Sequence, residues 1–562
     1  MTADAGLLAA ARAWLEQDPD LVTRDALLAI VDAAESGDPA AAGELAARFS
    51  GRLAFGTAGL RGELGAGPMR MNRVLVSQAA AGLAAYLLDR HATPSVVIGY
   101  DGRHNSEVFA RDTATIMAGA GVRAILLPRM LPTPVLAFAV RHFGTSAGVM
   151  VTASHNPPRD NGYKVYLGDG DQGAQIVPPA DAQIAAEIDR VAAGSIALLP
   201  RTTDFVIADE EVVDAYVLAT TALLRADAPR RGLRIAYSAM HGVGWEVASR
   251  VLEAAGADLR PVVEQIAPDP DFPTVAFPNP EEPGAMDLVL AHAASVGADL
   301  AIVNDPDADR LGAAVPTRDG GWRALRGNEI GLLLGWRAAE RLVAEGRTDE
   351  ALASSLVSSP ALALVAAAHG LRHEETLTGF KWISRVPGVG FGYEEALGYL
   401  VDPAKVRDKD GISAALDLVL LAGELAEAGR TVEDRLDEFA ERFGGVASGQ
   451  VSIRVTDLAE IASTTAALRA APPTAIAGRA VVAAEDFLAG VAPFPPGDIL
   501  RYRLEDGSRV IVRPSGTEPK LKVYLDAAAT GPGDGPSLRA AAAAAIEELE
   551  AGVRALLAEL GG

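Results

Sequence analysis

Three stretches of the chain share one pattern, in which a short apolar run is followed by a polar turn and then by a helical periodicity. The apolar runs are residues 96–98, 234–237 and 301–303. Such runs are typical of buried strands that feed loops in α/β units. After the first run, Asn105 and Ser106 predict a helix start, residues 110–120 its body and Gly121 its end. The pattern predicts three related α/β domains, although their sequences are too dissimilar to form a repeat.

The carboxyl-terminal part has a different pattern. Residues 499–504 and 508–512 flank the turn 505–507, which predicts a β-hairpin, and residues 521–525 predict a further strand. An amphipathic helical pattern follows over residues 538–560. These elements predict a smaller α+β domain at the end of the chain. The four expected domains are residues 1–204, 205–320, 321–445 and 446–562.

Length and composition indicate a globular protein of several domains. The chain has 562 residues, of which 49% are hydrophobic and 22% charged. Its net charge of -24 disfavours nucleic acid and anionic membranes as partners. An anionic small molecule would therefore need a local basic pocket. Residues 1–45 are rich in alanine with a helical pattern, and carry no readable function.

The compartment is expected to be the cytoplasm. The sequence contains no cysteine, which is compatible with a reducing compartment, and the first residues lack the basic region of a secretory signal. No apolar run approaches the roughly 20 residues that span a bilayer. We expect a soluble protein, a monomer or homodimer, with no membrane partner.

Lysine is scarce in this chain, and arginine supplies most of the positive charge. Most of the six lysines lie within or beside segments rich in Gly, Asp or Ser. Because an ammonium group differs chemically from a guanidinium, we favour a functional reason over chance clustering. The lysines are Lys164, Lys381, Lys405, Lys409, Lys520 and Lys522.

A serine beside a histidine ends one apolar run, in the segment Val-Thr-Ala-Ser-His-Asn-Pro at residues 151–157. A strand there would deliver Ser154 and His155 to a loop, where the hydroxyl can carry a phosphoryl group. Taken alone, the segment favours an ordinary helix-capping turn over a carrier, since Ser and Asn favour such positions. Two further segments favour the carrier.

Aspartates alternate with other residues at positions 305, 307 and 309. In an extended loop, all three carboxylates can turn to one side and offer the hard oxygen ligands that Mg²⁺ prefers. An EF-hand is excluded, because its sixth position would be Arg310 instead of Gly and its twelfth Pro316 instead of Glu. The alternative is a set of turn-forming aspartates, but three such carboxylates repel unless a cation or Arg310 compensates.

The second segment is Arg-Pro-Ser-Gly-Thr at residues 513–517. Its guanidinium, two hydroxyls and backbone amides offer a cradle for an oxyanion. A surface turn without a ligand is the alternative, but the segment directly follows a predicted hairpin strand. Carrier, metal and cradle together indicate phosphoryl transfer.

Two more segments carry polar chemistry. The Gly-rich loop at residues 55–62 contains Arg61, but no Gly-Lys-Ser/Thr follows, so binding of a nucleoside triphosphate is unsupported. Glu394 and Glu395, preceded by residues 378–381, form an adjacent pair of carboxylates. Such a pair can bind vicinal sugar hydroxyls or form a solvated acidic turn.

Five of these segments, taken in order, resemble the motifs of the α-D-phosphohexomutase family. They are residues 56–61, 152–157, 305–310, 394–395 and 513–517, and the resemblance extends from about residue 50 to 525. It implies an α/β fold with three related α/β domains and a fourth, TATA-binding-protein-like α+β domain, heart-shaped around a central cleft.

The resemblance also implies roles for individual residues. Ser154 resembles the phosphoserine, and Mg²⁺ would lie between its phosphate and Asp305, Asp307 and Asp309. Arg61 and Arg310 resemble the arginines near the transferring phosphate, and His155 is expected to be catalytic beside Ser154. Lys164 and Lys409 resemble lysines proposed for acid/base work or for charge stabilisation at the reacting hydroxyl. The residues expected to bind the sugar and its second phosphate are Thr378, Gly379, Lys381, Glu394, Glu395, Arg513, Ser515, Gly516 and Thr517.

The implied activity is that of a phosphoglucomutase, with mannose phosphates as further substrates and glucose 1,6-bisphosphate as activator. One departure leaves the sugar open: hexomutases often carry Ser two residues after the motif glutamate, where this chain has Ala396. The surroundings look most like the phosphoglucomutase-2-type branch, which includes phosphopentomutases. A phosphopentomutase is therefore an alternative. Two further alternatives are a non-catalytic phosphosugar-binding protein and a metal-dependent phosphatase.

Overall fold

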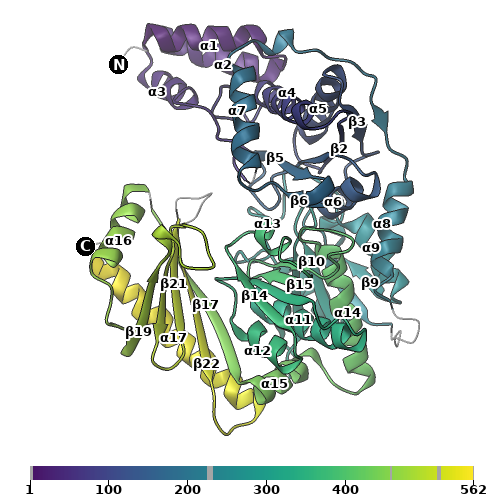
Figure 1. Cartoon of the computed structure of the whole chain (residues 1–562), viewed down its shortest axis with the longest axis vertical. Coiled ribbons are helices and arrows are strands. Elements are labelled where there is room, and N and C mark those ends of the chain that lie inside the picture. The colour runs from purple at the N-terminus through teal and green to yellow at the C-terminus, as the bar shows by residue number, and fades with distance from the viewer. Residues whose placement is uncertain (1–3, 58, 225–231, 456–457, 515–519, 561–562) are drawn as a thin grey trace. The chain divides into compact units, whose positions relative to one another are not determined.

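The computed structural model describes residues 4–57, 59–224, 232–455, 458–514 and 520–560 (Figure 1). The chain divides into two compact units. Residues 1–325 and 398–424 make up the first unit, and residues 326–397 and 425–562 make up the second. The segment 398–424 thus returns to the first unit after the chain has entered the second.

Three helices open the first unit, which confirms the helical pattern expected there. They are α1 (Ala5–Gln17), α2 (Leu21–Glu35) and α3 (Pro39–Arg48). The carboxylates of Asp20 and Asp38 cap α2 and α3 by accepting hydrogen bonds from the backbone N–H two residues later. Leu27, Val31 and Leu45 are fully buried where the three helices pack together.

The first β-sheet has the strand order β1-β5-β4-β2-β3-β7, with β6 beside β5. The central strands β2, β3 and β4 run parallel, and β5 is antiparallel to β4. Every residue of β2 and β4 is buried, as expected for strands covered on both faces. The strands are β1 (Leu60–Glu63), β2 (Ser95–Tyr100), β3 (Arg123–Leu126), β4 (Ala147–Val151), β5 (Asp160–Leu167), β6 (Ala174–Gln175) and β7 (Val206–Ile207).

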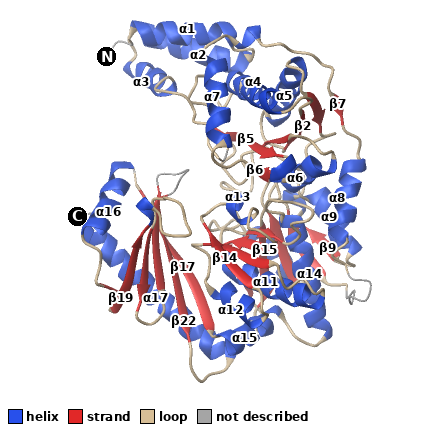
Figure 2. Ribbon diagram, viewed as in Figure 1, coloured by secondary structure: helices blue, strands red, loops and turns tan. Residues whose placement is uncertain are grey.

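Helices surround this sheet (Figure 2). They are α4 (Arg73–Arg90), α5 (Ser106–Gly119), α6 (Thr133–His142) and α7 (Ala180–Ala192). Helix α5 confirms the sequence prediction, because it begins directly after Asn105 and ends just before Gly121, whose φ of 91° stops it. Strand β4 ends three residues before Ser154 and delivers it to a loop, as expected.

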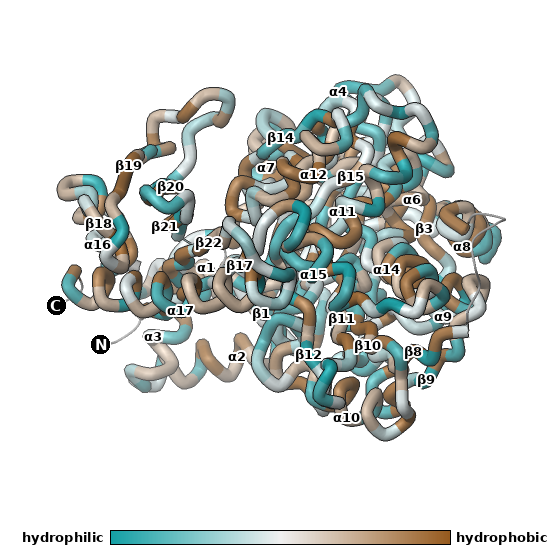
Figure 3. Tube along the Cα trace, turned by 90° about the horizontal axis from the view of Figure 1, so that it is seen from below, coloured by the Kyte–Doolittle hydropathy of each residue, from teal (hydrophilic) through white to brown (hydrophobic). Residues whose placement is uncertain are grey.

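The second sheet of this unit has the order β12-β11-β10-β8-β9. Strands β8, β9 and β10 are parallel, and β11 returns antiparallel to β10. Figure 3 shows hydrophobic stretches around β8 and β10, and all of β10 is buried. The elements are β8 (Arg234–Ser238), β9 (Asp258–Pro261), β10 (Leu300–Asn304), β11 (Leu311–Pro316), β12 (Trp322–Ala324), α8 (Glu211–Thr221), α9 (Trp245–Ala254) and α10 (Asp287–Val296).

The returning segment contains β16 (Gly398–Leu400) and the start of α14 (Gly411–Glu427). Gly398 forms an isolated β-bridge with Arg310. Gly411 lies so close to the same residue that an added Cβ would be 2.2 Å from the Arg310 carbonyl oxygen. The segment therefore packs against the loop that carries the three aspartates.

The second unit begins with a small parallel sheet, in which β13 lies between β14 and β15. Its elements are β13 (Ala351–Ser355), β14 (Arg372–Thr376), β15 (Val389–Glu394), α11 (Gly327–Ala344), α12 (Ala361–Ala368), α13 (Phe380–Ile383) and α15 (Val432–Phe443).

An antiparallel sheet of order β17-β22-β21-β20-β19-β18 follows. Its hairpin β20-β21, strand β22 and helix α17 confirm the elements expected from the sequence, and α17 runs along this sheet (Figure 1). The elements are β17 (Gly445–Arg454), β18 (Ala475–Ile476), β19 (Arg479–Asp486), β20 (Leu500–Leu504), β21 (Arg509–Pro514), β22 (Lys520–Ala529), α16 (Leu458–Ala470) and α17 (Gly535–Leu560). Among the described helices of the whole chain, none combines the length and apolar character needed to cross a bilayer.

Gly242, in the loop after β8, offers a test of how closely the aspartate loop is packed. A Cβ at this position would lie 2.2 Å from the Cα of Pro306, and the adjacent Val243 N–H donates to the Pro306 carbonyl at 2.9 Å. We expect Gly242→Ala to displace the aspartate loop, to destabilise the unit by about 1–3 kcal/mol through overpacking, and to weaken divalent-cation binding.

Urea unfolding followed by tryptophan fluorescence, and calorimetric titration with Mn²⁺, measure these two effects. Gly423→Ala is the control, because Gly423 lies in α14 with no atom within 4 Å of an added Cβ. That control should gain about 0.5–1 kcal/mol from helix propensity. Equal stability and Mn²⁺ affinity in Gly242→Ala and the native protein would contradict the close packing.

Candidate active site

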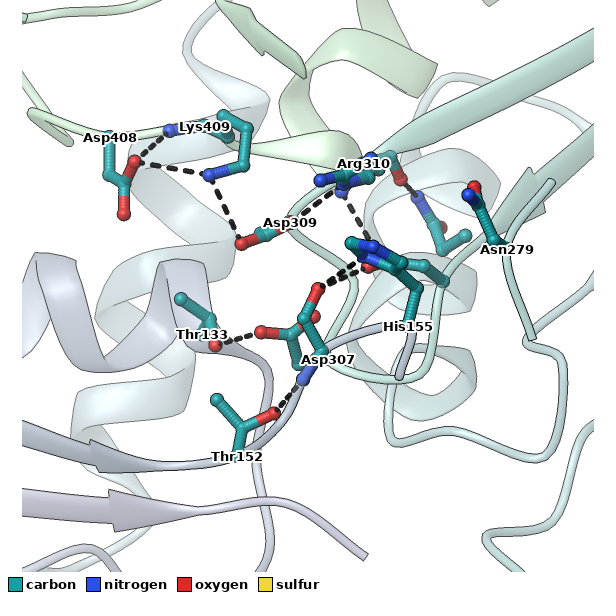
Figure 4. Close-up of polar contacts among 12 residues, drawn as sticks. Thr133, Thr152, His155, Asn279, Asp307, Asp309, Arg310, Asp408 and Lys409 are labelled. Carbon is teal, nitrogen blue, oxygen red and sulfur yellow. Dashed lines mark hydrogen bonds and ion pairs between the residues drawn. The ribbon is translucent and has the colours of Figure 1, made fainter. Parts of the chain in front are cut away.

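The structure brings the serine and the aspartates together, although 151 residues separate them in the chain. Ser154 lies in the loop after β4 and Asp305 in the loop after β10. The Ser154 Oγ donates a hydrogen bond to the Asp305 Oδ2 at 2.9 Å, and both residues are buried. The backbone N–H of Ser154 donates to the Thr152 Oγ1 at 2.8 Å (Figure 4). The hydrogen bond between Ser154 and Asp305 joins the two sheets of the first unit.

His155 accompanies the serine, as the sequence indicated. Its Nδ1 lies 3.2 Å from the Ser154 Oγ. Burial lowers the pKa of His155 well below its usual value, and the nearby positive charges of Arg310 and Arg61 lower it further. The imidazole is therefore neutral at pH 7 and can act as a hydrogen-bond partner of the serine.

The three aspartates form a compact cluster, but in a turn. One carboxylate oxygen from each of Asp305, Asp307 and Asp309 lies within 4.8 Å of the others. The Ala308 N–H donates to the Asp305 carbonyl at 2.8 Å, and Ala308 has a left-handed φ of 54°. The expectation of an extended loop was wrong, because this turn replaces strand-like alternation as the means of gathering the carboxylates.

The chemistry of this cluster fits a hard divalent cation. All three aspartates are at most 1% exposed. The Oδ1 atoms of Asp307 and Asp309 are buried and accept no hydrogen bond from the described part of the chain. Burial raises the pKa of Asp305 well above its usual value, and the adjacent carboxylates raise it further. A divalent cation would relieve that repulsion and bind the oxygen atoms that accept no hydrogen bond.

Two lysines reach the aspartates from other parts of the first unit. The Lys164 Nζ on β5 donates to the Oδ2 atoms of Asp307 and Asp309 at 2.8 and 3.0 Å. The Lys409 Nζ lies 3.3 Å from the same Asp309 Oδ2. Burial lowers the pKa of Lys164, but the two carboxylates outweigh it and the net shift is upward. Conversely, burial raises the pKa of Asp309, and the two lysines reverse this shift.

Thr133 supports the cluster, and sequence reasoning missed it. It begins helix α6, where its Oγ1 donates to the Asp307 Oδ2 at 2.6 Å and its N–H donates to the Asp307 carbonyl at 2.9 Å. Helix N-termini favour negative charge, which adds to these hydrogen bonds. The sequence signal was slight, since Thr133 stands between two prolines as in many helix starts.

The two predicted arginines lie beside the same groups. The backbone N–H of Arg310 donates to the Asp305 Oδ1 at 3.0 Å, and the side-chain Nε of Arg310 lies 3.9 Å from the Asp309 Oδ1. The Arg61 Nη1, on β1, donates to the Asn156 Oδ1 in the serine loop at 3.3 Å. Both guanidinium groups therefore lie close to the serine and the aspartates.

Lys409 is held by its neighbour Asp408. The Lys409 N–H donates to the Asp408 Oδ1 at 2.8 Å, while the Asp408 Oδ2 accepts from the Tyr166 hydroxyl at 2.9 Å and from the Gln175 Nε2 at 2.8 Å. Tyr166 stands two residues after Lys164 on β5, so both project from one face of the strand. One strand face thus holds the aspartate loop and the Lys409 loop.

The residues expected to bind the sugar lie in the second unit. Glu394 ends β15. Glu395 accepts hydrogen bonds from the hydroxyls of Ser355 and Ser358 at 2.9 and 3.0 Å, which anchor it within the unit. Thr378, Gly379 and Lys381 lie at and before the start of α13, where Gly379 has a φ of 111°.

The predicted phosphate cradle is described only in part. Arg513 lies near the end of β21, opposite Lys522 of β22. Ser515, Gly516 and Thr517 lie outside the described residues. Their role remains a prediction.

Comparison with known families agrees with this architecture. Four models of the phosphoglucomutase/phosphomannomutase family match the chain in order: alpha/beta/alpha domain I at residues 52–194, domain II at 214–320, domain III at 326–443 and the C-terminal domain at 451–531. The chain belongs to this family, which confirms the resemblance and the fold of three α/β domains and a distinct fourth. Since the family consists of phosphosugar mutases, the protein is an isomerase-type enzyme.

Individual relatives support the same conclusion. The chain is 55% identical to a probable phosphomannomutase of Haemophilus influenzae, over 87% of this chain and 98% of that protein. It is 34% identical to a probable phosphoribomutase of Schizosaccharomyces pombe, over 91% and 92%. It is 35% identical to a phosphoglucomutase of Staphylococcus epidermidis, over 84% and 90%.

A solved structure shares the fold. The structure of a putative phosphomannomutase from Thermus thermophilus superimposes with a TM-score of 0.69 and 23% identity, over 90% of this chain and 99% of that one.

Tyr166 provides a test of how Lys409 is held. Tyr166→Phe keeps the buried ring and removes the hydroxyl that donates to Asp408. Losing one hydrogen bond to a carboxylate should lower phosphosugar mutase turnover about tenfold, with little change in thermal stability. Steady-state kinetics and thermal denaturation measure both. Tyr163→Phe, on the same strand, is the control, because the Tyr163 hydroxyl has no hydrogen-bond partner among the described residues. Equal turnover in the two variants would show that Tyr166 does not orient Lys409.

Proposed function

We propose that the protein is a Mg²⁺-dependent phosphoglucomutase, with mannose phosphates as further substrates, that interconverts hexose 1-phosphate and hexose 6-phosphate. The observation that carries the proposal is the hydrogen bond of 2.9 Å between the Ser154 Oγ and the Asp305 Oδ2. It joins a carrier hydroxyl to a cluster suited to a divalent cation. Family membership supports the reaction class.

Asp305, Asp307 and Asp309, with a phosphate on Ser154, would hold Mg²⁺. When bound, the ion supplies positive charge that stabilises the transferring phosphoryl group. Arg61 and Arg310 add fixed positive charge beside the same group, and such preorganised charge provides much of the rate in phosphoryl transfer.

The first transfer begins with phosphorylated Ser154. A free hydroxyl oxygen of the hexose phosphate forms a bond to phosphorus, the bond between phosphorus and the Ser154 Oγ breaks, and its electron pair stays on the Oγ. The proton of the sugar hydroxyl passes to the Ser154 Oγ, which leaves with the electron pair and becomes the hydroxyl of the free serine. The ammonium groups of Lys164 and Lys409, which both lie within 3.3 Å of one Asp309 oxygen, would supply positive charge beside this transfer.

The second transfer reverses these events on the other phosphate. After the hexose 1,6-bisphosphate reorients, the Ser154 Oγ forms a bond to the second phosphorus, the sugar–phosphate bond breaks, and the proton returns to the sugar oxygen. Added glucose 1,6-bisphosphate would activate the enzyme by phosphorylating Ser154. The neutral imidazole of His155 would orient the Oγ.

Residues of the second unit would bind the rest of the substrate. Sugar hydroxyls and phosphate oxygens need directional donors and acceptors, which the following side chains and amides supply. For the sugar these are Thr378, Gly379, Lys381, Glu394 and Glu395, and for the non-reacting phosphate Arg513, Ser515, Gly516 and Thr517.

Removing the carrier hydroxyl tests the mechanism. We expect Ser154→Ala to lose turnover by about 10⁴-fold or more and to remain folded, with a loss of stability of about 1–3 kcal/mol because the hydrogen bond to the buried Asp305 carboxylate is removed. Coupled assay of glucose 6-phosphate formation and mass spectrometry of the Ser154 peptide after treatment with glucose 1,6-bisphosphate measure the effect. Ser195→Ala, on the exposed surface, is the control.

Near-native turnover in Ser154→Ala would rule out the carrier. A native protein that stays unphosphorylated and inactive would favour a phosphosugar-binding protein, and steady release of inorganic phosphate would favour a phosphatase.

A phosphopentomutase is the second candidate, favoured by Ala396 and by the likeness to a probable phosphoribomutase. We expect kcat/KM to be higher for glucose 1-phosphate than for ribose 1-phosphate. Ala396→Ser, which adds a hydroxyl beside the glutamate pair, should raise the hexose-to-pentose ratio about fivefold through one hydrogen bond. A panel of glucose, mannose and ribose 1-phosphates measures these ratios. A native preference for ribose 1-phosphate would assign the pentose activity instead.

A further inference from the structure

The loop that carries Ser154 is fixed by hydrogen bonds from one buried arginine, Arg103. Strands β2 and β4 are adjacent and parallel, with Tyr100 opposite Val151. The loops that follow these strands therefore start side by side at one edge of the sheet. The first loop carries Arg103 and the second carries Ser154.

The guanidinium of Arg103 is the common donor for the backbone of the Ser154 loop. Its Nη2 donates to the carbonyl oxygen of Ser154 at 2.5 Å and also to that of Asn156. Its Nη1 donates to the carbonyl oxygens of Pro157 and Asp160, at 2.8 and 3.1 Å. Four carbonyl groups within seven residues thus converge on one planar fork, a geometry that only arginine offers.

The arginine itself is held rigidly. The Asp101 Oδ1 accepts a hydrogen bond from the backbone N–H of Arg103 at 3.0 Å and another from the Ser106 Oγ at 2.6 Å. The guanidinium lies 4.9 Å from the centre of the Phe272 ring, and its side chain is only 1% exposed. The Nε is 3.5 Å from the Asp101 carboxylate, which is beyond a good hydrogen bond. The four carbonyl groups are therefore its principal partners.

Ser154 needs such support because of its backbone conformation. Its φ of 52° lies in the left-handed region, which disfavours residues with a Cβ. Arg103 holds the carbonyl group of Ser154, and the Thr152 Oγ1 holds its N–H at 2.8 Å. With both peptide groups fixed, the Cβ of Ser154 has one direction, and the Oγ reaches Asp305.

We propose that Arg103 is a positioning residue for phosphoryl transfer, which fixes the strained Ser154 loop through four backbone carbonyls and so aims the Oγ at the aspartate cluster. The guanidinium is too deeply buried to touch a sugar phosphate, so it acts only through this loop. This inference rests on the proposed role of Ser154 as carrier.

Arg103→Lys tests the proposal. A lysine keeps the charge, but its three donors sit on one atom and do not match four carbonyl groups spread along a loop. We expect kcat to fall about 100-fold, as for a reacting atom misplaced by about 1 Å. The KM for glucose 1-phosphate should stay near the native value, because the loop does not bind the sugar. Amide hydrogen exchange should become faster in residues 154–160. Arg111→Lys, on the exposed face of α5, is the matched control.

A second variant separates positioning from general stability. Arg103→Ala should lose more turnover than Arg103→Lys, and added guanidinium ion at low concentration should restore part of kcat. Native-like kcat or unchanged loop exchange in both variants would overturn the proposal. Loss of cooperative thermal unfolding in both would also overturn it, by assigning Arg103 to the stability of the whole unit. A native protein without mutase activity would instead reject the proposed function. The hydrogen-exchange measurement would still test whether Arg103 fixes the Ser154 loop.

Discussion

The mutual repulsion of three buried carboxylates is the constraint on which the first unit depends. Asp305, Asp307 and Asp309 are all within reach of one another and almost wholly removed from water. Such a cluster is unstable unless positive charge and hydrogen-bond donors compensate it. The chain supplies the positive charges of Lys164 and Lys409 and the hydroxyl donors of Thr133 and Ser154. These contacts tie the two sheets of the unit together. The same buried carboxylates that would bind a cation therefore require donors to be packed closely around them.

A single strand, β5, provides side chains that hold both the aspartate loop and the Lys409 loop. Alternate residues of a strand share a face, so Lys164 and Tyr166 both point to the same side. Lys164 binds the carboxylates of the aspartate loop, and Tyr166 binds Asp408 next to Lys409. The returning segment 398–424 is therefore positioned by the strand that also positions the aspartates. This explains why Lys409 lies in the first compact unit, although the match to family domain III extends over residues 326–443.

The sequence indicated the groups proposed to react but not the residues that hold them. Ser154 and the three aspartates could be predicted, because a hydroxyl and closely spaced carboxylates at strand ends are chemically conspicuous. The expected extended loop was wrong, since alternation in sequence does not specify whether Ala308 adopts a left-handed turn. Thr133, Tyr166 and Arg103 were missed as support residues. Each is an ordinary residue in its own segment, and its role arises from a partner 174, 242 or at least 51 residues away.

The division of labour between the two units follows from the chemistry of the proposed reaction. Carrier, aspartates, both lysines and both arginines belong to the first unit, whereas the residues proposed to bind the sugar and its second phosphate belong to the other. Phosphoryl transfer needs the reacting groups fixed to within a fraction of an ångström. Exchange of the two phosphates, by contrast, would require the sugar bisphosphate to turn and be bound in the reverse orientation. A proposed transfer centre contained in one compact unit would satisfy the first need, and the proposed binding residues of the other unit would satisfy the second without disturbing the buried charges.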